Sequence, residues 1–110
     1  MTTLELFQTE LKRIVKSLRD RYEPDKIILY GSMNQGRLKE NSDIDILIIK
    51  ESSLPPVKRI QEVYMLLLDL NYKVPFEPLV FTPSEIEERI SLGDPFIKEV
   101  TSRGRVIYEK

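Results

Sequence analysis

The sequence predicts an α/β fold, in which helices pack against a short mixed β-sheet. Stretches with apolar residues every three or four positions alternate along the chain with short apolar runs of strand character. Such alternation is typical of layered α/β domains. No repeat, low-complexity tract or flexible linker interrupts the pattern, and a length of 110 residues suits one domain. We therefore expect residues 1–110 to form a single domain.

Residues 3–22 are predicted to form a helix, because their apolar side chains recur at alternating intervals of three and four. The resulting stripe consists of Leu4, Phe7, Leu11, Ile14 and Leu18. Pro24 lies just beyond and is a typical helix stop. The apolar run 26–30, KIILY, then predicts a buried strand that ends at Gly31.

A second strand is predicted over residues 43–49, DIDILII, whose Ile and Leu residues fall on both faces. Apolar residues on both faces are typical of a central strand that is covered on both sides. A short helical turn over about 32–38 should connect the two strands. After a turn at 52–56, residues 57–70 are expected to form a helix with a wide apolar face.

The third predicted strand, 74–81, contains Pro75 and Pro78. Proline cannot donate a ladder hydrogen bond. This strand should therefore lie at an edge of the sheet or be irregular.

Two helix starts follow. The segment 82–85, TPSE, offers a threonine N-cap, a proline at the first helical position and a glutamate at the third. Asp94 and the proline after it begin another helix in the same way, through about Ser102, and Gly104 ends it. Residues 106–108 are expected to form a last short strand.

The composition excludes several kinds of chemistry. The chain has no Cys and no His, which rules out disulfides, thiolate nucleophiles and Ser-His catalysis. A metal site would have to use oxygen ligands, which suits Mg²⁺ or Mn²⁺. The formal net charge of −1 does not favour a polynucleotide substrate, since proteins that grip nucleic-acid phosphates usually carry a basic surplus.

The N-terminal stretch, MTTLELFQTELKR, has no long apolar core and does not resemble a signal peptide. No stretch approaches transmembrane length. We therefore expect no membrane association and a cytoplasmic location.

Residues 31–45, GSMNQGRLKENSDID, contain the most informative pattern of the chain. Glycine at Gly31 lets the backbone approach a ligand closely, and backbone N–H groups with the Ser32 hydroxyl can hold a phosphate. The stretch is neither a Walker A loop nor a Rossmann fingerprint. By itself a glycine-serine pair is also compatible with a plain tight turn in which Ser32 is an N-cap.

Asp43 and Asp45 are alternate residues of a predicted strand, so their side chains should point the same way. Their Cα atoms should lie about 6.5–7 Å apart, at about 3.3 Å per residue. Two carboxylates at this spacing repel each other and can share metal ions. The alternative is that both acids are solvated ahead of the strand, with Asp43 as a cap.

The combined pattern G-S-x3-G-x5-S-D-x-D resembles the signature of the DNA polymerase beta-like nucleotidyltransferase superfamily. In size the chain is similar to the minimal nucleotidyltransferases of that superfamily. The resemblance covers nearly the whole chain, from the first helix through the KIILYGS and SDIDILII segments to VPFEPLVFTPSEIEER and IKEVTSRGRVIYEK. It implies a nucleotidyltransferase that uses Mg²⁺ or Mn²⁺ and ATP or another nucleoside triphosphate.

The resemblance also implies residue roles. Gly31 and Ser32 would bind the triphosphate, and Ser42 would steady the turn that aims Asp43. Asp43 and Asp45 would hold the metals.

The family's third carboxylate, on a neighbouring strand before a T-P-x-E helix start, corresponds to Glu77. Glu77 would ligate the catalytic metal and help to activate the attacking hydroxyl. It is longer than the commoner aspartate, and its alternative role is an ordinary exposed acid of an edge strand.

The chain departs from the family near Gly36, where many relatives have small residues and an arginine. Asn34 and Gln35 occupy these places here. Arg37 or Lys39 would then have to bind the terminal phosphates.

The function that the resemblance implies is transfer of a nucleoside monophosphate, AMP from ATP above all, to a hydroxyl of an acceptor. Minimal nucleotidyltransferases commonly pair with a helical HEPN-type protein, often as its antitoxin, which makes such a protein the expected partner and acceptor. Met65 to Leu68, four apolar residues in a row, are consistent with an interface on the 57–70 helix. That helix could instead be buried on two sides within the domain.

Other functions are also compatible with the sequence. The changes near Gly36 and at Glu77 allow a catalytically weak or inactive subunit that only binds its partner. A small-molecule nucleotidyltransferase is less favoured because such enzymes usually carry a further acceptor domain, and a polymerase is disfavoured by charge and size. The base preference, the number of nucleotides transferred, the acceptor and any homo-oligomer are left open, and Tyr22, Tyr64 or Tyr72 could be modified by the chain itself.

Overall fold

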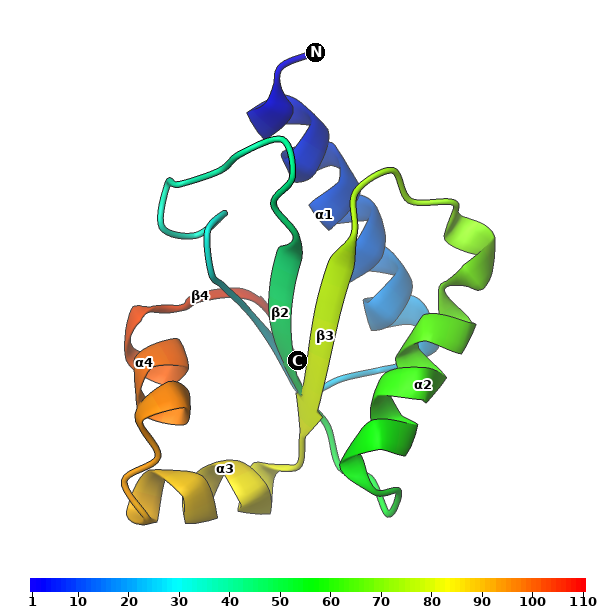
Figure 1. Ribbon diagram of the computed structural model, residues 1–110. Helices are drawn as coiled ribbons and strands as arrows, with labels where there is room; N and C mark the ends of the chain where they lie inside the picture. The colour runs from blue at the N-terminus through cyan, green and yellow to red at the C-terminus, as the bar shows by residue number, and fades with distance from the viewer.

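The computed structural model describes residues 1–110 as a four-stranded mixed sheet with helices on both faces (Figure 1). The strands are β1 (Lys26–Tyr30), β2 (Ile44–Ile49), β3 (Phe76–Phe81) and β4 (Arg105–Glu109), in the order β3-β2-β1-β4. The central strand β2 pairs antiparallel with β1 and parallel with β3, and β1 pairs antiparallel with β4. The predicted α/β class with a short mixed sheet is confirmed.

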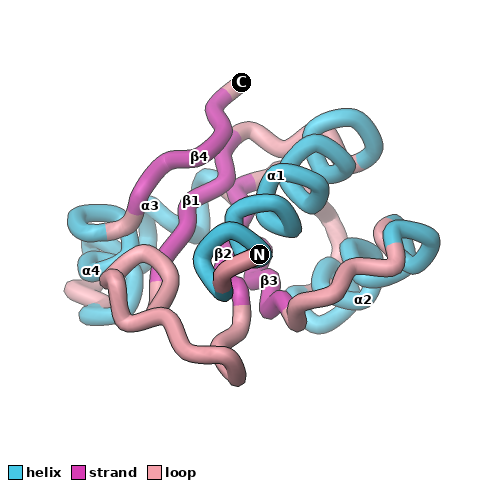
Figure 2. Tube along the Cα trace, turned by 90° about the horizontal axis from the view of Figure 1, so that it is seen from above, coloured by secondary structure: helices cyan, strands magenta, loops and turns pink.

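The helices are divided between the two faces of the sheet. Helices α1 (Thr3–Arg21) and α2 (Pro56–Leu66) lie on one side, and α3 (Pro83–Ser91) and α4 (Pro95–Arg103) on the other (Figure 2). None of these helices combines the length and the apolar character that a transmembrane span needs.

Each face of the sheet has its own core. The larger core lies under α1 and α2 and contains Ile44, Ile46 and Ile48 of β2. The smaller core lies under α3 and α4 and contains Leu47. Because alternate strand residues point to opposite faces, Asp45 belongs to the α3–α4 face, where it is half-buried.

The helix starts agree with the sequence. The Glu85 N–H donates to Thr82 Oγ1 and the Thr82 N–H donates to Glu85 Oε1, which is a capping box at the start of α3. Asp94 caps α4 by accepting from the N–H groups of Phe96 and Ile97, and Gly104 follows the last residue of α4.

Several predicted bounds were wrong. The short helical turn expected at 32–38 is limited to one α-type turn, in which the Gln35 N–H donates to the Gly31 carbonyl, and Gly36, with φ +72°, prevents its continuation as a helix. The expected helix 57–70 ends at Leu66 and is followed by a separate 3₁₀ turn, Leu68–Leu70. The strand expected at 43–49 begins at Ile44, so Asp43 precedes it.

The third strand, expected at 74–81, begins at Phe76. Its predicted position at an edge of the sheet is confirmed. Pro75 precedes the strand and its carbonyl accepts from the Ile44 N–H at 2.9 Å. The two prolines thus fall at the start and on the edge of the sheet, where a missing donor is tolerated.

Candidate active site

The glycine-serine turn and the second aspartate are in contact. Gly31 directly follows β1 and has φ +80°, a left-handed conformation that favours glycine. A Cβ at Gly31 would lie only 2.2 Å from Asp45 Oδ2. Both halves of the sequence pattern therefore meet at one point, at the end of β1.

The turn after Gly31 presents unpaired amides. The Gln35 N–H donates to the Gly31 carbonyl at 3.0 Å, and the Arg37 N–H donates to the Ser32 carbonyl at 2.9 Å. The N–H groups of Ser32, Met33 and Asn34 donate to no acceptor within the protein. Consecutive free N–H groups at a tight turn suit an anion such as a phosphate.

The turn is anchored at two points. The Met33 side chain is buried in the larger core. The Asn34 side-chain amide donates to the Arg103 carbonyl at the end of α4, at 3.0 Å. The turn is thus tied both to the sheet and to a helix that lies far along the sequence.

Asp45 is the centre of a row of polar residues across the sheet. In strand register it lies opposite Tyr30 on β1 and opposite Glu77 on β3. Asp43 lies two residues before it, outside the strand. The register thus places Glu77 beside Asp45, as the resemblance implied.

The charges of these acids affect one another. Burial, followed by the charges of Glu77 and Asp43, raises the pKa of Asp45 to about 6 from its ordinary value of 3.8. Burial and the charges of Asp45 and Glu77 also raise the pKa of Tyr30 to about 12. A cation in this region would relieve the repulsion between the carboxylates.

The donor set consists of carboxylate oxygens only, which suits Mg²⁺ or Mn²⁺. No three carboxylates in the structure stand close enough together to hold one metal ion. Glu77 is exposed on the edge strand, whereas Asp45 is half-buried. The carboxylate ligands and the negative potential around Asp45 therefore suit a divalent cation.

Ser42 closes the turn that precedes Asp43. The Lys39 N–H donates to Ser42 Oγ at 2.9 Å, and the Ser42 N–H donates to the Lys39 carbonyl at 3.0 Å. The hydroxyl is thus engaged in shaping the loop. Direct contact of Ser42 with a nucleotide stays a prediction.

A pocket of about 350 Å³ opens between the turn and α4. Residues from both ends of the chain line it, among them Tyr30, Gly31, Gln35, Arg37, Phe96 and Arg103. The edge of Phe96 packs against the ring of Tyr30 with centroids 5.5 Å apart. The pocket adjoins Asp45 through Gly31, and its α4 side was missed by the sequence analysis because no local signal marks it.

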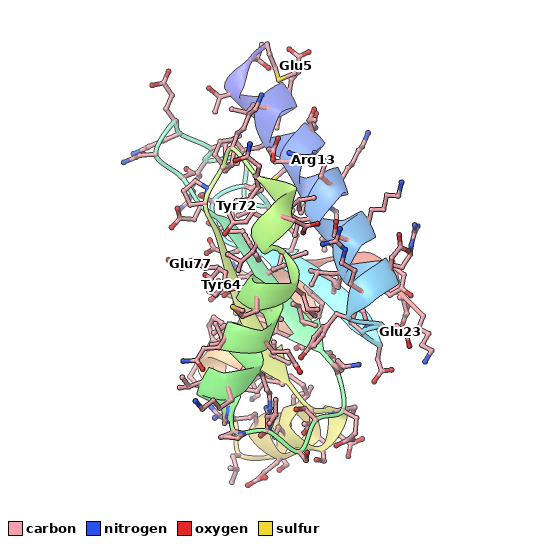
Figure 3. All side chains as sticks on the ribbon, turned by 90° about the vertical axis from the view of Figure 1, so that its right-hand side faces the viewer. Glu5, Arg13, Glu23, Tyr64, Tyr72 and Glu77 are labelled. Atoms are coloured by element: carbon pink, nitrogen blue, oxygen red, sulfur yellow. The ribbon has the colours of Figure 1, made fainter.

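On the other side of the acids, three aromatic residues surround a shallow groove beside β3. The Tyr64 hydroxyl donates to the Phe76 carbonyl at 2.9 Å, and the Tyr72 and Phe76 rings lie edge to face at 4.9 Å. Figure 3 shows Tyr64 on α2, Tyr72 in the segment between α2 and β3, and Glu77 on β3. Phe76 belongs to the core under α1 and α2, so this groove lies on the face opposite to the one that carries Asp45 and, in register with it, Glu77.

Comparison with known proteins defines the class of the protein. The family model "Polymerase beta, Nucleotidyltransferase" matches residues 12–110. The chain belongs to this family, and it is a nucleotidyltransferase of the minimal type.

Relatives match along nearly all of the chain. A protein of Methanocaldococcus jannaschii named as a protein adenylyltransferase is 34% identical over 100 residues, which are 89% of this chain and 94% of the relative. A second such protein of the same organism is 27% identical over 106 residues, covering 94% and 97%. The protein adenylyltransferase MntA of Thermococcus cleftensis is 42% identical over 48 residues, 44% of this chain and 48% of the relative.

Solved structures share the fold. A toxin–antitoxin complex with AMP-PNP contains a chain that superimposes with a TM-score of 0.62 at 23% identity, covering 90% of this chain and 73% of that one. A nucleotidyltransferase structure from Sulfolobus solfataricus gives a TM-score of 0.58 at 14% identity, covering 98% and 81%. These likenesses establish the nucleotidyltransferase architecture.

Proposed function

We propose that residues 1–110 act as a minimal nucleotidyltransferase domain that transfers AMP from ATP to a hydroxyl of a partner protein, with Mg²⁺ or Mn²⁺ bound. One observation carries this proposal: the Gly31–Ser32 turn touches Asp45, which lies in register with Glu77. Phosphate-binding amides and paired acids thus occupy adjacent positions.

The residues have distinct roles in this proposal. The Ser32 hydroxyl and the free amides of the turn hold the phosphates, and Arg37 adds positive charge from the pocket wall. Asp43, Asp45 and Glu77 are the metal ligands. Ser42 keeps Asp43 in place through the closed turn.

The chemical step requires a hydroxyl oxygen to attack the α-phosphorus while the bond to the pyrophosphate oxygen breaks. Bound Mg²⁺ would neutralise the charge that develops on the phosphates. Glu77 is exposed on the edge strand and is the acid best placed to accept the proton from an incoming hydroxyl. The turn amides stabilise the leaving pyrophosphate, so the chain acts mainly by positioning and electrostatics.

A helical protein of the HEPN type is the partner that we propose as acceptor, with this chain as its antitoxin. The relatives' names, protein adenylyltransferase, and the toxin–antitoxin structure support this choice. Met65 of α2 and Leu68 of the turn that follows it are 68% and 69% exposed, so α2 is not buried on two sides within this domain. These side chains offer an apolar surface to a helix of the partner.

Titration of ATP with Mg²⁺ into the wild type and into Asp43→Asn/Asp45→Asn tests the nucleotide and metal site. We expect binding that depends on the metal in the wild type and its loss in the folded variant. Glu51→Gln, a change of one exposed acid after β2, is the matched control and should bind as the wild type does. Absence of binding in a folded wild type would overturn the proposal.

A second candidate is a subunit that binds its partner with little or no catalysis. It is favoured by the arrangement of the carboxylates, no three of which stand close enough together to hold one metal ion. For this candidate, Asp45→Asn would bind and neutralise the partner as well as the wild type does. Under the first proposal the same variant would still bind the partner and would fail to neutralise it.

A further inference from the structure

The arginines of the chain differ in whether they form an ion pair. Most of them form ion pairs with a carboxylate, namely Arg13, Arg19, Arg21, Arg59 and Arg89. Three have no carboxylate within ion-pairing distance: Arg37, Arg103 and Arg105. These three guanidinium groups are free to bind an external anion.

Two of the three free arginines line the same pocket. Arg37 comes from the end of the glycine-serine turn, and Arg103 is the last residue of α4. They are far apart in sequence and enter the pocket from different walls. Arg105 lies on the edge strand β4 and does not line this pocket.

The position of Arg103 is fixed by the turn itself. The Asn34 side chain donates to the Arg103 carbonyl at 3.0 Å, which joins the end of α4 to the turn that carries the free amides. The Gly104 N–H donates to the Val100 carbonyl at 2.8 Å and closes the helix end. Arg103 is thus attached to the proposed phosphate site by its backbone, while its guanidinium group has no acidic partner.

The charge of the pocket suits a polyanion. Its charged lining groups are the two arginines and Glu99, which lies one helical turn before Arg103 and forms no ion pair with it. Asp45 lies just beyond Gly31 and makes the opposite end of the site negative. A triphosphate that reaches from the acids into the pocket would therefore place its outer phosphates between two guanidinium groups, which bind phosphates bidentately.

We propose that Arg103 binds the outer phosphates of the nucleotide together with Arg37, and that this pair makes the site select a nucleoside triphosphate over a monophosphate. This inference rests on the proposed function, because it needs the nucleotide at the Gly31–Ser32 turn. It assigns a substrate-binding residue to α4.

The test compares ATP, AMP and inorganic tripolyphosphate by titration calorimetry with Mg²⁺ held constant. Arg103→Ala should weaken binding of ATP and of tripolyphosphate about tenfold, as for loss of one charged phosphate contact, and change AMP binding less than about twofold. Arg103→Lys should retain part of the affinity. Arg105 is exposed, unpaired and outside the pocket, so it provides the control. The Arg105→Ala variant should bind all three ligands as the wild type does.

The outcomes separate this inference from the proposed function. If the wild type binds ATP and Arg103→Ala binds it equally well, the inference is wrong and the nucleotide site stands. If ATP and AMP lose affinity equally in a variant with an unchanged melting temperature, Arg103 contacts the nucleoside and not the outer phosphates, which also overturns the inference. A folded wild type that binds none of the three ligands would overturn both.

Discussion

Gly31 lies against the carboxylate of Asp45 so closely that a Cβ would stand 2.2 Å from Oδ2. The contact arises because β1 and β2 are antiparallel neighbours, with Tyr30 opposite Asp45, so the residue after β1 turns directly over the acid. Gly31 therefore meets two requirements at once: a left-handed φ of +80° and the absence of a side chain. Glycine at position 31 therefore both permits the turn and leaves room for the Asp45 carboxylate.

Gly31→Ala should abolish ATP binding and destabilise the domain. Left-handed backbone costs alanine about 1–2 kcal/mol, and the clash with Asp45 adds roughly 1–3 kcal/mol. Gly93→Ala is the matched control, because Gly93 has φ +78° with nothing within 4 Å of its added Cβ. Urea unfolding and calorimetry with ATP would measure both effects.

The control should show the backbone cost alone and bind ATP normally. Equal destabilisation in the two variants, with ATP binding retained in Gly31→Ala, would mean that the Asp45 carboxylate moves aside freely. The close contact would then have no role in shaping the site.

Asp45 should weaken the fold at neutral pH when no metal is present. Its pKa is raised to about 6, from 3.8, by burial and by the charges of Glu77 and Asp43. The folded state therefore holds a proton that the unfolded chain releases, so stability falls as pH rises from about 4 to about 6. Asp45→Asn removes this penalty.

Thermal melts in metal-free buffer measure the effect. After allowance for solvent screening we expect Asp45→Asn to be more stable than the wild type by about 1 kcal/mol at pH 8, or roughly 4–8 °C in Tm. The difference should vanish near pH 4, and Asp43→Asn, which removes one neighbouring charge, should give a smaller gain. A variant that melts below the wild type at pH 8 would contradict the raised pKa.

Metal binding should compete with the proton on Asp45. Because a carboxylate must lose its proton to ligate a cation, the affinity for Mn²⁺ should fall up to about tenfold for each pH unit below the pKa of about 6, and stay level above it. Electron paramagnetic resonance of free Mn²⁺, without nucleotide, would follow this directly. An affinity that is the same at pH 5 and pH 8 would exclude Asp45 as a ligand.

The sequence was sufficient for the parts of the fold that local chemistry decides. The capping box at Thr82, the central strand with Ile and Leu on both faces, and the edge position of the proline-containing strand were all predicted correctly. Helix ends were less accurate, because the end of α2 depends on tertiary packing: Leu67 is fully buried while Leu68 points to solvent. Periodicity alone cannot separate these two leucines.

For the site, the sequence supplied the residue types and the resemblance supplied their roles, but not their arrangement. The pairing of Asp45 with Glu77 depends on the register of two parallel strands that α2 separates in the chain. Arg103 reaches the pocket only because α4 packs beside the glycine-serine turn. Arg103 lies 69 residues after Asn34, the residue of the turn that donates to its carbonyl. Neither relationship has a local sequence signal.

Glu77→Gln should slow transfer much more than it weakens ATP binding. The amide cannot accept the proton of the incoming hydroxyl, so pyrophosphate release in the presence of the acceptor should fall about 10²-fold or more, while ATP affinity changes less than about tenfold, since two ligands remain. Glu87→Gln on α3, also an exposed acid, serves as the control. Transfer at the wild-type rate in Glu77→Gln would reduce Glu77 to an ordinary acid of an edge strand.

The exposed apolar residues of α2 and the following turn should matter for the partner and not for the fold. Met65→Lys/Leu68→Lys changes side chains that are 68% and 69% exposed, so the melting temperature should hold within a few degrees. Binding to a purified helical protein of the proposed HEPN type should weaken about 100-fold or more, because two apolar contacts are replaced by charges that the interface would have to desolvate.

Leu92→Lys provides the comparison for this surface, since Leu92 is 75% exposed after α3, on the opposite side of the sheet. It should leave partner binding unchanged. ATP binding should be unaffected in both variants, because neither residue lines the pocket at Gly31. Loss of partner affinity in Leu92→Lys, with retention in the double variant, would contradict this prediction and move the partner surface to the α3–α4 face.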